Sequence, residues 1–247
     1  MTDLRLPGVI GHRGIARDAP ENTLAGFSLA AAKGVDWIEL DVQLTSDGVP
    51  VVFHDDRLER TSNGRGRLTE TPFADLLRLD AGRWFSDRFA GERIPEFGDV
   101  LDRLVGLGLG LCLEIKADEE RGAATASAAL DLLVRRWPAG GRVPLLSSFA
   151  KSALAVMAGR APDWPRGLLV PDLSGEWRGD VRRLGCRSLH VDHRALDERQ
   201  VAAVKAEGLA LLAYTVNDRS RAEQLWGWGV DALFSDCPDA LLERPDR

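Results

Sequence analysis

The chain has 247 residues, 45% of them hydrophobic, and a formal net charge of −6. This length suits one (β/α)8 barrel or two small domains, and the composition is that of a folded chain with a full apolar core. The acidic balance gives no support for a nucleic-acid or membrane-surface partner, although a locally positive site could still bind an anionic small molecule.

Cysteine content and apolar patterning favour a reducing compartment and no membrane span. The three cysteines are an odd number without a CxxC pair, which disfavours a disulfide framework and a zinc–thiolate site. The charge at Asp3 and an expected first strand near Val9 leave no room for a signal peptide. The longest apolar stretch, residues 104–113, is interrupted by glycines and is too short to cross a bilayer. We therefore expect a cytoplasmic protein; the sequence assigns no oligomeric state.

Short apolar runs alternate with helical patterns from end to end, which predicts a parallel sheet with helices between its strands. Strands are predicted over residues 9–12, 37–43, 49–54, 109–115, 143–148, 167–170, 188–191, 209–215 and 232–235. Helices are predicted over residues 23–33, 97–105, 123–137, 151–161, 198–207 and 219–228. Asn22 is interpreted as the N-cap of the first helix and Gly34 as its C-terminal stop.

Nine strands are one too many for an eightfold barrel, and the turn after the second strand identifies the extra one. Residues 45–48 read Thr-Ser-Asp-Gly, a tight hairpin signal. Parallel neighbours need a crossover of about a dozen residues or more, so the third strand must run antiparallel to the second. Eight parallel strands remain. They predict a (β/α)8 TIM barrel whose return strand brings His54 to the C-terminal mouth, where such barrels carry their active sites.

One long interruption, residues 57–95, separates the return strand from the next helix. It is rich in Arg, Gly and aromatic residues, with one short helix expected near residues 73–79. Connections of this length are uncommon unless they are functional. We expect a single domain over residues 1–247, with this segment as a small cap over the barrel mouth.

Charged side chains gather at the ends of the predicted strands. Glu39 and Asp41 lie two apart on one strand and share a face, as do Glu114 and Lys116 on another. Outside the barrel these carboxylates would be buried against helices without partners, which is costly, so the mouth is the better placement. Three neighbouring carboxylates repel one another unless a positive charge lies among them, and an all-oxygen cluster suits Mg²⁺ or Ca²⁺ better than zinc.

Other residues at the same mouth suit a phosphate substrate. Arg13 and Lys116 add fixed positive charge that can bind phosphate oxygens. His12 and His54 can supply one proton acceptor and one proton donor near neutral pH. The pattern therefore indicates metal-assisted chemistry on a phosphate group.

Each of these signals is weak by itself. A Glu-x-Asp pair on a strand is common, and a histidine at a strand end is more often a satisfied polar residue. The glycine run at 106–110 precedes a strand instead of opening a helix, so a dinucleotide-binding loop is rejected. A helical His-Asp phosphohydrolase is disfavoured because the residues before His54 are strand-like. His190 and His193 have no spaced carboxylate partners and are assigned structural roles.

The motifs together are more specific than any one of them. They are His12-Arg13-Gly14, Glu21-Asn22-Thr23, Glu39-Leu40-Asp41-Val42, Asp47-Gly48 followed by Val52-Phe53-His54-Asp55, Glu114-Ile115-Lys116, Tyr214-Thr215-Val216-Asn217 and Ser235-Asp236-Cys237-Pro238. On these residues the chain resembles the glycerophosphodiester phosphodiesterase family over nearly its whole length, and looks most like its short cytoplasmic bacterial members.

The resemblance implies a (β/α)8 barrel with a small inserted cap and a set of site residues. By that resemblance one divalent metal, Mg²⁺ or Ca²⁺, is held by Glu39, Asp41 and Glu114, the catalytic pair is His12 and His54, and phosphate is contacted by Arg13 and Lys116. Tyr214 stands where the family usually has Trp, and it keeps an aromatic ring beside the substrate. Phe149 is expected to shape the alcohol pocket together with the cap.

The implied reaction is hydrolysis of a glycerophosphodiester, a small-molecule substrate, to sn-glycerol 3-phosphate and an alcohol such as choline, ethanolamine or glycerol. Two alternatives stay open. A related barrel that cleaves lysophospholipids or inositol phospholipids would need an apolar or basic membrane-binding surface, which the sequence does not offer. A non-catalytic barrel that binds phosphate ligands is disfavoured because all three carboxylates and both histidines are present.

Overall fold

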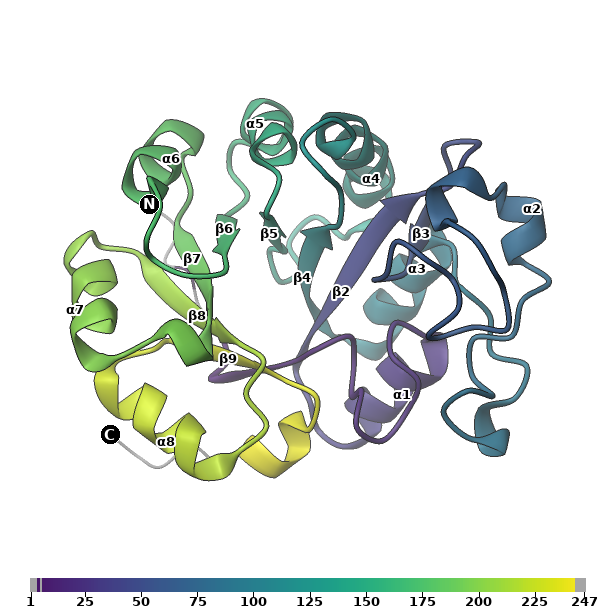
Figure 1. The fold of residues 1–247 in the computed structure, drawn as a ribbon, viewed down its shortest axis with the longest axis horizontal. Helices are drawn as coiled ribbons and strands as arrows, with labels where there is room; N and C mark the ends of the chain where they lie inside the picture. Colours follow the sequence, from purple (N-terminus) through teal and green to yellow (C-terminus); the bar gives the residue numbers. More distant parts are fainter. Residues whose placement is uncertain (1–3, 5, 243–247) are drawn as a thin grey trace.

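The computed structural model describes residues 4 and 6–242 and contains a nine-stranded sheet (Figure 1). Asp3, part of the expectation that the chain has no signal peptide, lies outside the described residues. The strands are β1 (Val9–Gly11), β2 (Trp37–Leu44), β3 (Pro50–Val52), β4 (Gly110–Ile115), β5 (Leu145–Ser148), β6 (Arg166–Val170), β7 (Ser188–Asp192), β8 (Ala210–Tyr214) and β9 (Ala232–Ser235).

Eight of these strands close into a parallel ring. Successive strands pair in parallel from β4 to β9, β9 pairs with β1, and β1 and β4 both pair with β2. The ninth, β3, runs antiparallel to the end of β2, with Val42 opposite Val52 and Leu44 opposite Pro50. The predicted (β/α)8 TIM barrel with an antiparallel return strand is therefore confirmed.

Helices surround this ring on the outside (Figure 1). They are α1 (Leu24–Ala32), the short α2 (Phe73–Leu76), α3 (Phe97–Leu107), α4 (Gly122–Arg136), α5 (Lys151–Arg160), α6 (Trp177–Leu184), α7 (Glu198–Ala206) and α8 (Arg219–Trp228). Helix α6 is absent from the prediction because three arginines and Gly179 leave it with few apolar residues, although these have helical spacing. It buries Trp177, Val181 and Leu184, spaced four and three residues apart.

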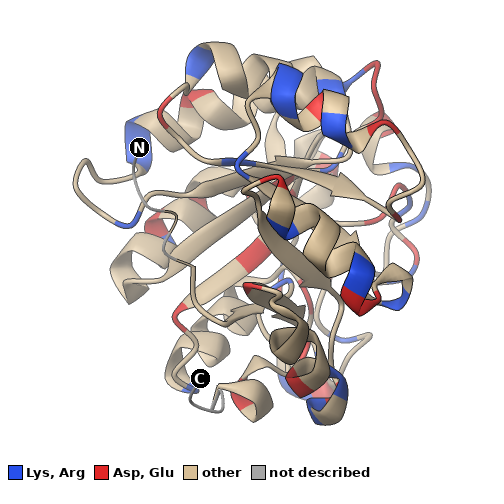
Figure 2. Ribbon diagram, turned by 90° about the vertical axis from the view of Figure 1, so that its left-hand side faces the viewer, with Lys and Arg blue, Asp and Glu red and all other residues tan. Residues whose placement is uncertain are grey.

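Strand residues divide between two apolar cores according to the alternation of their side chains. On β2, Ile38, Leu40 and Val42 pack in the larger core between the sheet and the helices. Trp37 points the other way and joins Cys112 in a smaller core inside the barrel. The same alternation places Glu39, Asp41 and Gln43 on the inner face. Figure 2 colours Asp and Glu red: most of the coloured residues lie on helices and loops, but acidic residues are also found on the strands.

The start of α1 differs from the prediction. Thr23, and not Asn22, is the N-cap: its backbone is extended and its hydroxyl accepts a hydrogen bond from the backbone N–H of Gly26 at 3.1 Å. Asn22 instead takes a left-handed backbone with φ 57°. That conformation turns its amide inward, where it donates a 2.8 Å hydrogen bond to Asp41 Oδ2. The interpretation of Asn22 as a cap is therefore wrong by one residue.

Residues 57–95 contain α2 and two short 3₁₀ turns, and they lie beside β3, α1 and α3 (Figure 1). The segment has a small apolar core of its own that includes Leu58, Leu68, Leu76 and Ile94. This core also takes Val51 and Phe53 of the return strand, which anchors the segment to the barrel. Its role as a cap stays a prediction.

The described residues contain no helix that is both long enough and apolar enough to cross a membrane.

Candidate active site

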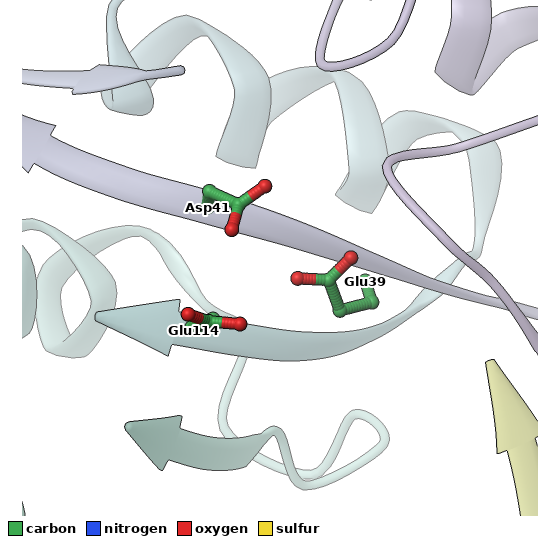
Figure 3. A group of neighbouring side chains, drawn as sticks. All are labelled: Glu39, Asp41 and Glu114. Atoms are coloured by element: carbon green, nitrogen blue, oxygen red, sulfur yellow. The ribbon is translucent and has the colours of Figure 1, made fainter. Parts of the chain in front are cut away.

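Three carboxylates converge on the inner face at the mouth of the barrel (Figure 3). Glu39 and Asp41 extend from β2, and Glu114 extends from the neighbouring β4, where it lies directly opposite Asp41. Each residue offers an oxygen within 4.8 Å of the others. All three are buried, with exposed fractions of 4%, 1% and 7%, so the repulsion between them is poorly screened by water.

Two cations and one backbone N–H face these carboxylates, besides the Asn22 amide bound to Asp41. Arg13 Nε lies 3.2 Å from Asp41 Oδ2, and the backbone N–H of Arg13 donates to Glu39 Oε2 at 3.0 Å. Lys116 Nζ lies 3.2 Å from Glu114 Oε1. Neither ion pair has hydrogen-bond geometry, so Arg13 Nε and Glu114 Oε1 are both buried without a hydrogen-bond partner. Two positive charges thus face three carboxylates. These two cations therefore leave the cluster incompletely neutralised.

The raised pKa values of two of the three carboxyls indicate the same shortage of positive charge. Burial, followed by the charges of Asp41 and Glu114, raises the pKa of Glu39 well above its usual value. Burial and the charge of Asp41 raise the pKa of Glu114 to about 7. Asp41 is also buried, which opposes ionisation, but the charge of Arg13 and further cations lower its pKa. An all-oxygen cluster of this kind fits a hard divalent cation.

His12 follows β1 in a turn that glycine makes possible. A Cβ on Gly11 would lie 2.1 Å from the carbonyl oxygen of Gly14, so a larger residue would push this turn open. His12 Nδ1 is 2.7 Å from Asp236 Oδ1, and the amide of Asn217 donates to Asp236 Oδ2 at 2.7 Å. The carboxylate thereby favours a proton on Nδ1 and leaves Nε2 available for chemistry.

His54 lies just beyond β3 and has a similar partner. Its Nδ1 is 2.6 Å from Asp55 Oδ1. The Gln43 amide holds the backbone in place by donating hydrogen bonds to the carbonyls of Phe53, His54 and Asp55 at 3.0, 2.9 and 3.0 Å. Burial lowers the pKa of His54, which favours its neutral form near pH 7.

The two histidines line one hollow of about 140 Å³ at the barrel mouth. Its lining includes eight of the nine residues singled out from the sequence, namely His12, Arg13, Glu39, His54, Glu114, Lys116, Phe149 and Tyr214. Asp41 is the ninth and belongs to the adjoining carboxylate cluster. Phe149 and Tyr214 meet edge to face with ring centroids 6.2 Å apart, and Lys116 Nζ is 5.6 Å from the Phe149 centroid.

His190, which the sequence analysis treats as structural, also lines this hollow. Its imidazole Nε2 is 3.0 Å from Ser188 Oγ, and burial lowers its pKa to about 3, so it is neutral. Strand alternation could have placed Ser188 and His190 on the inner face, since Leu189 and Val191 pack outward. His193 lies on a 3₁₀ turn, where its carbonyl accepts from Arg221.

Four side chains that hold the site residues were not predicted from the sequence to do so. Asp55 and Asp236 bind the histidines, while Asn22 and Gln43 bind Asp41 and the backbone around His54. Asp55, Asp236 and Asn22 belong to the motifs that carried the family resemblance, but no contact with a site residue was assigned to them. The contacts of Asp236 and Asn22 join residues that are far apart along the chain.

Comparison with known proteins decides the family. The sequence matches the Glycerophosphoryl diester phosphodiesterase family over residues 12–240. The chain belongs to this family. The resemblance drawn from its motifs is therefore confirmed, and the protein is an enzyme that hydrolyses glycerophosphodiesters.

Several bacterial relatives match along most of their length. A glycerophosphodiester phosphodiesterase of Caldanaerobacter subterraneus is 34% identical, with 95% of this chain and 96% of the relative covered. One from Bacillus subtilis is 30% identical, with 93% and 83% covered. An Oleispira antarctica phosphodiesterase, solved with the product sn-glycerol-3-phosphate, is 40% identical with a TM-score of 0.92, covering 96% of this chain and 95% of that one.

Proposed function

We propose that this protein is a metal-dependent glycerophosphodiester phosphodiesterase that releases sn-glycerol 3-phosphate and an alcohol, with His12 and His54 as its acid–base pair. One observation carries the proposal. Two histidines, each bound at Nδ1 by an aspartate, line the same hollow as a buried cluster of three carboxylates. Sites with two proton carriers beside clustered acidic ligands suit phosphodiester hydrolysis.

Glu39, Asp41 and Glu114 would hold one divalent metal, Mg²⁺ or Ca²⁺. Their oxygens lie within 4.8 Å of one another, and Glu114 Oε1 is buried without a hydrogen-bond partner. The bound ion would supply positive charge that polarises the phosphoryl group. The raised pKa values of Glu39 and Glu114 support this assignment, because they mark carboxylates that are short of positive partners.

Arg13 and Lys116 would bind the phosphate, and Phe149 and Tyr214 would form the apolar wall for the rest of the substrate. Both cations lie beside the carboxylate cluster and line the hollow with the histidines. The hollow's 140 Å³ suits a small molecule better than a polymer. Support for the glycerol end comes from the Oleispira antarctica neighbour, which binds sn-glycerol-3-phosphate.

The two histidines would divide the proton transfers. With Nδ1 bound to aspartate, each can accept or donate at Nε2. One would accept a proton from the glycerol hydroxyl next to the phosphoester as that hydroxyl attacks phosphorus, while the other donates a proton to the departing alcohol, leaving a cyclic 1,2-phosphate. Water would then open the ring with the two roles exchanged, giving sn-glycerol 3-phosphate, so both histidines return to their starting protonation.

The sequence supports several further assignments within this proposal. They are a single domain over residues 1–247, a cap formed by residues 57–95, a cytoplasmic location, and the absence of a nucleic-acid or membrane partner. None of them is needed for the chemistry proposed above.

A turnover screen tests the proposal. The purified protein is incubated with sn-glycero-3-phosphocholine, sn-glycero-3-phosphoethanolamine, glycerophosphoglycerol and lysophosphatidylcholine, each with Mg²⁺ or Ca²⁺, and products are identified by ³¹P NMR. We expect sn-glycerol 3-phosphate from the water-soluble diesters. Faster turnover of the lysolipid would favour the lipid-cleaving alternative, and binding of all substrates without turnover would favour the non-catalytic one.

A further inference from the structure

We propose that Arg60 is a positioning residue for the reaction: its guanidinium, carried by the inserted segment, holds the two carboxylates that orient His54 and Arg13. This inference rests on the proposed function, because it takes His54 as a proton carrier and Arg13 as a phosphate ligand. It gives residues 57–95 a part in catalysis besides their predicted role as a cap.

The contacts of Arg60 use all three of its guanidinium nitrogens. Nη1 and Nη2 donate to Glu21 Oε2 and Oε1, both at 2.7 Å. Nε and Nη2 donate to Asp55 Oδ2 and Oδ1 at 2.5 and 2.8 Å. Each carboxylate is therefore gripped through both of its oxygens, which fixes its plane as well as its position.

Each of these carboxylates also contacts a residue of the site, so a fixed carboxylate fixes the orientation of that residue. Asp55 Oδ1 lies 2.6 Å from His54 Nδ1, and Glu21 Oε1 accepts from Arg13 Nη1 at 2.7 Å. Rotation of either carboxylate would carry its partner with it. One side chain thus sets the direction of an imidazole and of a guanidinium that lie in the same hollow.

The partner of His12 is held differently. Asp236 receives its second hydrogen bond from Asn217, a neutral amide that follows β8. Asp55 instead depends on a charged residue of the inserted segment. Loss of Arg60 should therefore disturb His54 and leave the His12–Asp236 pair in place.

The fold of the inserted segment does not depend on Arg60 alone. The Arg60 side chain is 45% exposed but its partners Glu21 and Asp55 are 10% and 23% exposed, so any effect of these ion pairs on stability is measured beside kcat. The segment already has an apolar core that includes Leu58, Leu68 and Leu76. Lysine could supply the charge of Arg60, but not the planar fork that grips two carboxylates at once.

The first test is Arg60→Met, which keeps much of the aliphatic stem and removes the guanidinium. We expect kcat to fall about 10- to 100-fold, the usual range for loss of an outer partner that orients a site residue. KM should rise by a smaller factor than kcat falls, because Lys116 does not contact Arg60 and Arg13 keeps its ion pair with Asp41 even when Glu21 is no longer held. Arg57→Met is the matched control: Arg57 lies in the same segment, is 62% exposed and pairs with Glu59. Its kcat should stay within about twofold of the parent.

Two further variants separate positioning from a general effect on folding. Arg60→Lys should recover less than half of the lost kcat on a logarithmic scale, and it carries the test if Arg60→Met does not fold. In an Asp55→Asn background, Arg60→Met should cost much less than it does alone, because its main route to His54 is already broken. Folding of every variant is checked by circular dichroism and thermal melting.

Three results would overturn the inference: parental kcat in folded Arg60→Met, full recovery by Arg60→Lys, or losses that simply multiply in the double variant. His54→Ala separates this inference from the proposed function. If His54→Ala keeps its activity, the proposed function fails. If His54→Ala is inactive and Arg60→Met is fully active, the role of Arg60 alone is wrong.

Discussion

Each proposed catalytic histidine depends on one short contact with an aspartate. His12 pairs with Asp236 and His54 pairs with Asp55, at 2.7 and 2.6 Å between Nδ1 and the carboxylate. These pairs settle the ring orientation before substrate binds, which is the condition for efficient proton transfer. Most of the predicted site residues line the same hollow, but the aspartates that orient the histidines were not assigned from the sequence.

Removal of either histidine should therefore abolish most turnover. We expect His12→Ala and His54→Ala each to lower kcat by at least ~10²-fold, the scale of one general acid or base. His193→Ala is the control, because His193 lies on a surface turn and contacts Arg221. Steady-state assays on sn-glycero-3-phosphocholine measure the effect. A larger loss from His193→Ala than from His54→Ala would contradict the assignment.

The carboxylate cluster predicts that metal binding depends on pH. Without metal, the pKa of Glu114 is raised to about 7 and that of Glu39 is raised as well, so these groups hold protons near neutral pH. A metal must displace those protons. Apparent affinity for Mg²⁺ should thus rise as pH increases through about 7, with proton release on binding.

Titration calorimetry at pH 6, 7 and 8, in two buffers of different ionisation enthalpy, measures both the affinity and the protons released. Glu114→Gln is the informative variant, because it removes one titrating carboxyl and should reduce the proton release. Affinity that stays constant across this range, with no proton release, would show that these carboxyls are already ionised in the metal-free protein.

At the scale of elements, the hairpin between β2 and β3 brings His54 back to the barrel mouth. The Asp-Gly turn and the length of the connection were enough to predict it, because parallel neighbours cannot be joined so tightly. The sequence did not indicate the contact that holds the backbone of residues 53–55, just after β3. Gln43 points inward from β2 and ties the carbonyls of Phe53, His54 and Asp55.

Gln43→Met tests whether the Gln43 amide holds the backbone of residues 53–55 in place. The thioether has a similar length but cannot donate, so three carbonyls lose a buried donor. We expect the free energy of unfolding to fall by about 1–3 kcal/mol. We also expect a lower kcat, because His54 loses its fixed backbone. Urea unfolding and steady-state assays measure the two effects. Gln224→Met on the exposed face of α8 should change neither. Parental stability and activity in Gln43→Met would show that the loop holds its position without the amide.

The start of α1 and the whole of α6 could not be predicted from local sequence patterns alone. The sequence placed the first helix correctly but assigned its cap to Asn22, because both Asn and Thr are good capping residues. A tertiary contact decided between them, since Asn22 binds Asp41 on a different element. Helix α6 was missed because only three of its eight residues are apolar, although Trp177, Val181 and Leu184 have helical spacing and are buried together.

For the whole molecule, the barrel converts an alternating sequence pattern into a site. Parallel strands put Glu39, Asp41 and Glu114 on one inner face at one end of the ring. Such convergence follows from strand period and topology, and it could be predicted. The links from Arg60 to Glu21 and Asp55 could not, because the inserted segment has no periodic pattern that fixes where its side chains point.

We propose that hydrolysis of glycerophosphodiesters by this barrel needs a metal held by its three buried carboxylates. The most direct test is the release of sn-glycerol 3-phosphate from sn-glycero-3-phosphocholine, measured before chelation, after chelation, and after Mg²⁺ or Ca²⁺ is returned. Metal content is determined at each step by mass spectrometry. Turnover should be lost with the metal and should recover when the metal is restored. Full activity in excess chelator, with metal removal verified, would show that the carboxylates hold no catalytic metal.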